Sequence, residues 1–391
     1  MRNWNRRARM KERAVFLDKL RVAATCAVVL LHTVTGVMDH TDMEAYPLEK
    51  TVFLVLLDLI CWCVPVFLLI SGYLFLNPDR KITMGKMLGR YCRRIALALL
   101  VFGVPYACLE QIATERCFRW RMIGNSFLMV VRGESWSHLW YLYLILFLYL
   151  LTPGLKKLLE VLPRPILYIL LTALFIGSSV LPYLVKLLDL KAVWVLPDWV
   201  IYLFYYISGF LFWDGFRSTG SQEGKSVEEI PVACDQFKGI KPENSIQEKT
   251  ETNKKGRKRK AWSGGYLAAA LAFAMVCSRL SGSYTLQMAY NYPFTAVLSL
   301  LLFQWGSSMH GKDSSKHRKM ENFWKQAALL SFTVYLVHPV FLNTAYKFFH
   351  VTPLSFPIGI SLPVFFGIVL LLSVVVAWVL YRIPFLRKYV L

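Results

Sequence analysis

The feature that most constrains this chain is a series of apolar stretches long enough to cross a lipid bilayer. The first, FLDKLRVAATCAVVLLHTVTG, runs from Phe16 to Gly36, and about 20 such residues span the hydrocarbon core. Backbone groups in lipid must be satisfied within the segment, so these stretches predict helices. We expect an all-α integral membrane protein with about ten transmembrane helices, at roughly 16–37, 50–76, 95–112, 138–153, 166–185, 196–214, 264–280, 290–309, 325–346 and 357–381.

The composition agrees with a membrane protein and excludes an ordinary soluble domain. Of the 391 residues, 56% are hydrophobic and 15% aromatic. The formal charge of +21 raises the question of nucleic acid or anionic lipid as a partner. Loop charge that orients membrane spans explains it better, so we expect the lipid bilayer and no nucleic acid.

Lysine and arginine are distributed unequally between the two sets of connections. With the N-terminus inside, only nine of the 45 fall on the outer side: Lys50, Arg116, Arg119, Arg121, Arg132, Lys186, Lys191, Arg279 and Lys347. Such a bias predicts that both termini lie in the cytoplasm. We therefore expect a multi-pass protein of the cytoplasmic membrane.

One polar segment divides the apolar stretches into two groups. Residues 215–262 are rich in Gly, Ser, Glu and Lys and show no apolar period, which is typical of a disordered linker. The predicted organisation is therefore six helices in 1–214, a basic cytoplasmic linker in 215–262, and four helices in 263–391. Its KKGRKRK block either binds anionic lipid or only flanks the next span.

Arg21 and His32 lie within the first stretch, where ionisable groups are costly and usually functional. Eleven residues at about 100° each return His32 to within about 20° of Arg21, roughly 16 Å further along the helix. A buried imidazole is favoured in its neutral form and accepts a proton, so His32 is a candidate general base. Asp18 is placed to pair with Arg21. The alternative makes Arg21 an interfacial anchor and His32 a structural residue.

A second cationic group lies at the cytoplasmic start of the third stretch. Arg90, Arg93 and Arg94 follow one another at i, i+3 and i+4, so they share one helix face. Three guanidinium groups there form a candidate site for phosphate or carboxylate, with ordinary loop charge as the alternative.

Further polar residues lie in or near the apolar stretches. Asp58 is at a depth similar to His32 and is a candidate to orient its imidazole, and His338 lies near the middle of the ninth stretch. His138 and Glu110 lie at outer ends, where they are candidates to bind an acceptor. Packing roles are open for all four. The serines of ISGYLF and YYISGFLF are better explained by close helix contacts than as nucleophiles. No metal-ligand spacing occurs, and no metal is expected.

The motifs together resemble the acyltransferase-3 family of integral membrane acyltransferases. Arg21 and His32 match the family's arginine and histidine in the first span, and Arg90 and Arg93 match its Arg-x-x-Arg motif. Four more segments resemble the family in the same order: PVFLLISGYLF, HLWYLYLILFLYLLTP, YYISGFLF and SFTVYLVHP. The similarity covers all ten stretches and is closest to stand-alone O-acetyltransferases of surface polysaccharides.

The resemblance implies both substrates and a reaction. The donor is acyl-coenzyme A, usually acetyl-CoA, arriving from the cytoplasm as a co-substrate. The acceptor is a hydroxyl of a polysaccharide or lipid-linked glycan at the opposite face. In this reaction His32 would act as general base. The alternative is that His32 itself accepts the acyl group and forms an acyl-histidine intermediate. Two other interpretations remain open: a transporter of glycan or lipid-linked intermediates, and a membrane sensor or anchor.

Overall fold

The computed structural model of this protein describes residues 2–80, 82–189, 195–225, 266–277, 279, 289–308 and 315–391. Within those ranges the chain is helical and has no strand. The α-helices are α1 (Arg2–His40), α2 (Pro47–Ile60), α3 (Cys63–Phe75), α4 (Met84–Lys86), α5 (Arg93–Ala98), α6 (Val104–Glu115), α7 (Arg121–Arg132), α8 (Trp140–Val161), α9 (Arg164–Phe175), α10 (Leu181–Leu187), α11 (Val200–Lys225), α13 (Pro293–Ser308), α14 (Ser315–Asn343), α15 (Ile358–Arg382) and α16 (Pro384–Tyr389).

Seven helical segments of the described ranges are long and apolar enough to cross a membrane. They are Val15–His40, Pro47–Phe75, Met84–Glu115, Ser137–Val161, Arg164–Leu187, Lys319–Phe348 and Ile358–Arg382. Three shorter apolar helices, Val200–Phe212, Tyr266–Cys277 and Pro293–Ser307, lie where the sixth, seventh and eighth spans are predicted. The prediction of an all-α membrane protein is confirmed, while the count of ten and the orientation of the termini stay predictions.

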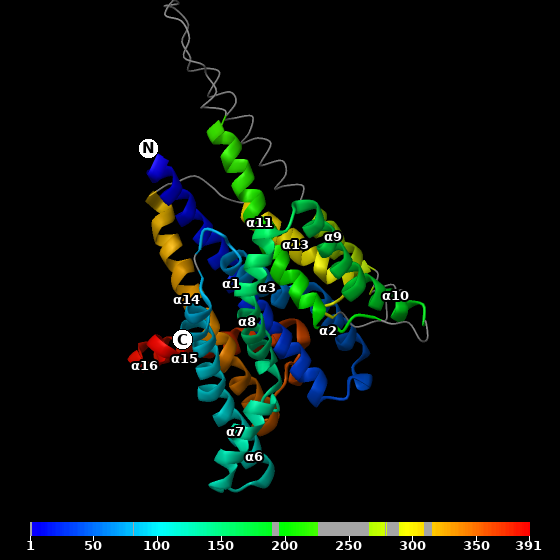
Figure 1. Ribbon diagram of the computed structural model, residues 1–391. Helices are drawn as coiled ribbons and strands as arrows, with labels where there is room; N and C mark the ends of the chain where they lie inside the picture. Colours follow the sequence, from blue (N-terminus) through cyan, green and yellow to red (C-terminus); the bar gives the residue numbers. More distant parts are fainter. Residues whose placement is uncertain are drawn as a thin grey trace, which may run out of the picture.

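Helix α1 lies at the centre of the bundle. It packs against α2, α3, α13, α14 and α15, and Figure 1 shows it beside α14. Its interior residues Val28, Val29 and Val34 are almost fully buried. The helix that bears Arg21 and His32 is therefore packed against five other helices, with part of its surface buried between them.

Several spans are irregular where proline occurs, because proline lacks an N–H and its ring clashes with the carbonyl four residues earlier. The second span turns at Cys61 and Trp62, just before Pro65, and resumes as α3. A π-helical segment, η3 (Leu99–Gly103), comes before Pro105 in α6. Two more π-helical segments are η2 (Met87–Cys92) and η5 (Ile176–Val180), and η6 (Thr344–Phe348) extends α14.

Helices α3 and α11 cross in direct backbone contact. A Cβ atom added at Gly72 would lie 1.8 Å from the carbonyl oxygen of Tyr206, and one at Gly209 would lie 2.3 Å from that of Leu69. Each position therefore requires glycine, since the obstructing atoms belong to the backbone. The glycines of both Ser-Gly segments therefore serve helix packing.

Helix α11 runs to Lys225, so its last turns cover the start of the predicted linker. Residues 226–265 lie outside the described ranges. The division into six helices, linker and four helices thus remains a prediction.

Candidate active site

Three histidines from separate parts of the chain meet inside the bundle. His32 comes from α1, His338 from α14, and His138 from the short 3₁₀ segment η4 (Ser137–Leu139) that leads into α8. The ring centre of His32 lies 5.0 Å from that of His338 and 6.4 Å from that of His138, and the last two are 5.9 Å apart. Three of the predicted site residues are thus brought together.

The hydrogen bonds of this cluster define which ring nitrogens bear hydrogen. His32 Nδ1 lies 2.9 Å from the carbonyl oxygen of Val28, and His338 Nδ1 lies 3.2 Å from that of Val334. A carbonyl oxygen only accepts, so in the neutral rings both Nδ1 atoms bear hydrogen. His338 Nε2, 3.2 Å from His32 Nδ1, is then an acceptor toward His32.

This arrangement leaves the second nitrogen of His32 as its basic atom. His32 Nε2 has no hydrogen-bond partner among the described residues, and it is not enclosed. The ring lines a cavity of about 340 Å³ at the end of the bundle where α1 ends. His338 is fully buried behind His32 and does not line this cavity.

The chain between α7 and α8 places His138 beside the cavity. Helix α7 ends at Gly133, whose φ of 78° is strained for other residues, and the N–H of Glu134 bonds the carbonyl of Met129. Tyr335 donates its hydroxyl hydrogen to the carbonyl of His138. His138 is 3% exposed, and its Nε2 has no partner among the described residues.

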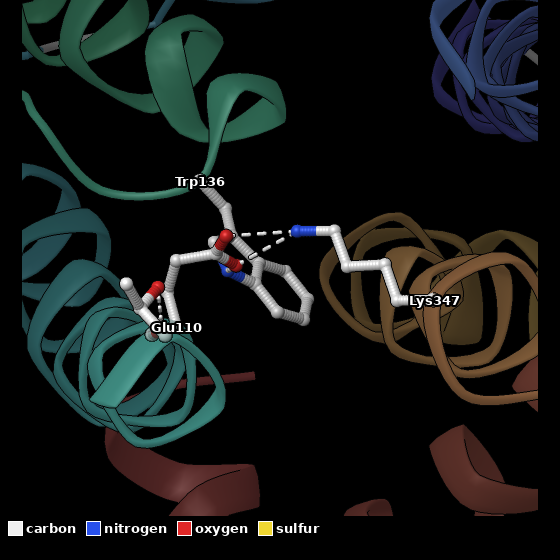
Figure 2. Close-up of polar contacts among 4 residues, drawn as sticks. Glu110, Trp136 and Lys347 are labelled. Atoms are coloured by element: carbon white, nitrogen blue, oxygen red, sulfur yellow. Dashed lines mark hydrogen bonds and ion pairs between the residues drawn. The ribbon is translucent and has the colours of Figure 1, made fainter. Parts of the chain in front are cut away.

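The cavity wall also contains an ion pair that joins two helices. Lys347 of η6 lies with its Nζ 2.8 Å and 3.1 Å from the two carboxylate oxygens of Glu110 in α6. Trp136 donates from Nε1 to the same carboxylate at 3.2 Å, as Figure 2 shows. The indole ring in turn stacks on Tyr106, with ring centres 4.4 Å apart. Glu110 therefore lines the cavity as predicted for an acceptor-binding residue, but its carboxylate already has two protein partners.

Arg21 lies on the N-terminal side of this cluster and does not line the cavity. Its Nη1 lies 3.4 Å from Asp18, which confirms the predicted pair. Tyr141 and Tyr149 of α8 both lie beside Ser71 and close enough to Arg21 to interact with its charge. The two tyrosines of α8 are thus neighbours of Arg21.

Asp58 has a different neighbour from the one predicted. Arg279 donates from Nε to Asp58 Oδ2 at 2.9 Å and from Nη2 to Oδ1 at 3.0 Å. Both side chains are buried, and the hydrogen bonds of His32 do not include Asp58. An arginine expected in an outer loop therefore neutralises this buried carboxylate, and sequence spacing gives no sign of the pairing.

The predicted arginine cluster lies at the opposite end from the cavity, on the side of α16. Arg90, Arg93 and Arg94 are exposed. Arg94 donates from Nε to the carbonyl of Val390 at 3.1 Å, and the guanidinium of Arg93 lies 5.8 Å from the ring centre of Tyr389. The three cations are accessible to an anionic ligand.

Comparison with known families accounts for nearly the whole chain. A family model described as an acyltransferase domain, the acyltransferase-3 model, matches residues 15–382. Searches of curated proteins and of solved structures returned no match. No group of three or more His, Cys, Asp or Glu side chains suited to a metal ion occurs in the described ranges. The chain belongs to the acyltransferase-3 family and is a membrane enzyme that transfers acyl groups.

Proposed function

We propose that this protein is an O-acyltransferase of the cytoplasmic membrane. It moves an acyl group, most simply acetyl, from acyl-coenzyme A to a hydroxyl of a surface polysaccharide or lipid-linked glycan. The observation that supports this most is the accessible Nε2 of His32 at the wall of the cavity, with Nδ1 held by Val28 and His338.

The geometry suits general base catalysis by His32. Its Nε2 takes the hydrogen of the acceptor hydroxyl as that oxygen attacks the thioester carbonyl, and the C–S bond then breaks. The proton on the imidazolium passes to the departing thiolate. During the reaction, the Val28 carbonyl and His338 Nε2 both accept from Nδ1–H and so stabilise the imidazolium.

The donor enters, in this proposal, from the end of the bundle where Arg90 and Arg93 are exposed. Guanidinium groups bind the phosphates of coenzyme A through paired N–H donors. In the predicted topology that end faces the cytoplasm, and the cavity faces the outside. Arg21 lies between the two ends.

The test is acetyl transfer by the purified protein in lipid nanodiscs. Radiolabelled acetyl-CoA is supplied with glycolipids extracted from the native membrane, and label in the glycan is counted. His32→Ala should lower transfer at least about a hundredfold, the usual size of a general-base contribution. His350→Asn is the control, because His350 is exposed with a φ of 51° that asparagine tolerates.

Two outcomes would contradict the proposal, and the second would favour transport. Full transfer by His32→Ala protein at equal folded concentration contradicts the role of His32. Failure of the wild-type protein to bind acetyl-CoA, measured by calorimetry, contradicts the acyltransferase proposal and favours a transporter of glycans.

A further inference from the structure

The cavity beside His32 has a chemical character of its own. Its volume of about 340 Å³ lies at the lower end of the range for small-molecule sites, so it holds one ring-sized group rather than a polymer segment. Trp136 contributes an aromatic side chain to the wall, and His32 and His138 line the same cavity. Aromatic side chains are common partners of the apolar faces of sugar rings.

The charges of the cavity wall are predominantly negative. Asp39, Glu110 and Glu134 line it, and Lys347 is its one lysine or arginine among the described residues. Lys347 is already paired with Glu110. Asp39 and Glu134 have no cationic partner within 4.0 Å in the described ranges. An acidic ligand would therefore meet uncompensated like charge.

The arginines of the nearby outer segment do not reverse this balance. Arg116, Arg119, Arg121 and Arg132 do not line the cavity, and Arg119 is paired with Glu115 at 3.3 Å. They lie on and around the hairpin of α6 and α7, which projects from one end of the bundle in Figure 1. None of these four cations is part of the cavity wall.

A second observation points to a ligand. His138 lines the cavity, and its buried Nε2 has no hydrogen-bond partner among the described residues, which is unfavourable for a polar atom. A hydroxyl both donates and accepts, so it satisfies this atom in either tautomer of the ring. An acceptor ring with one hydroxyl at His32 and another at His138 fits both imidazoles, whereas a carboxylate suits only a protonated nitrogen.

We propose that this cavity is the acceptor subsite and that it selects a sugar unit without an acidic group. The inference rests on the proposed function and adds the class of acceptor. Hydroxyls bind at His32 and His138, and uncharged or amine-bearing positions face Asp39 and Glu134. Acidic sugars are excluded by charge rather than by size.

The experiment compares the binding of three sugar probes in the absence of the donor. Saturation-transfer NMR on the protein in nanodiscs measures three probes that differ in one group: hexyl β-glucoside, hexyl β-glucosaminide and hexyl β-glucuronide. The glucuronide should bind about tenfold or more weakly than the other two. The Asp39→Asn, Glu134→Gln double variant should reduce that difference to about twofold. Glu49→Gln, which removes a carboxylate that does not line the cavity, should leave it unchanged.

Equal or stronger binding of the glucuronide, or binding of none of the three, would overturn the inference. So would unchanged selectivity in the double variant. Transfer from acetyl-CoA to the three probes is then measured separately. Selective binding without transfer would contradict the proposed acyltransferase function while leaving the selectivity of the cavity established.

Discussion

His338 Nε2 lies 3.2 Å from His32 Nδ1, and the two residues are 306 positions apart in the chain. Because His338 Nδ1 faces the carbonyl of Val334, its Nε2 accepts from His32. His338 and the Val28 carbonyl therefore together hold the tautomer and orientation of the candidate base, and His338 does not line the cavity. In this proposal it is a positioning residue and not the substrate-binding residue that the sequence suggests.

Replacing His338 should lower kcat and leave KM for both substrates nearly unchanged. His338→Leu removes one of the two acceptors of His32 Nδ1–H and leaves the Val28 carbonyl, and we expect a loss in kcat of about tenfold to a hundredfold. His338→Gln should recover part of that loss, since an amide oxygen can accept the same hydrogen bond. Acetyl transfer at saturating substrate measures this. Equal activity of the Leu and Gln variants would contradict a positioning role.

Arg90 and Arg93 should affect the affinity for the donor. The Arg90→Gln, Arg93→Gln double variant is expected to raise KM for acetyl-CoA severalfold, with kcat within about twofold, because phosphate contacts are lost. The difference should shrink at high salt, since exposed charges are screened. Lys157→Gln is the control, as it removes an exposed cation from α8. An unchanged KM would contradict donor binding by this cluster.

The ion pair of Asp58 and Arg279 should matter for stability more than for catalysis. Leaving one buried charge without its partner costs about 3–5 kcal/mol, so Asp58→Asn and Arg279→Gln should each lower the melting temperature. The double variant should lose less than the sum of the two. Both variants should keep their kcat per folded molecule. A selective loss of kcat in Asp58→Asn would instead support the predicted contact with His32.

The crossing of α3 and α11 should not tolerate a side chain at its closest point. Gly72→Ala brings a methyl group against the backbone of Tyr206, and overpacking of this kind costs about 1–3 kcal/mol or more. Gly367→Ala is the matched control, because nothing lies within 4 Å of a Cβ atom there. Thermal unfolding followed by size-exclusion chromatography compares them. Equal melting temperatures would contradict the close crossing.

The membrane fold and several local contacts of this protein follow from the local composition of the chain. Membrane insertion depends on the length and apolarity of each segment, so the all-α membrane fold follows from the sequence. The pair of Asp18 and Arg21 follows from helical spacing, and the glycine contacts of α3 and α11 follow from the small residues in those segments.

Tertiary packing decided which distant side chains meet. His32, His138 and His338 come together because α1 packs against α14 and because the chain turns at Gly133 to bring η4 beside them. Asp58 is paired with Arg279 rather than His32 for the same reason. Helical periodicity defines the face on which a side chain lies, but only packing between helices defines what that face meets.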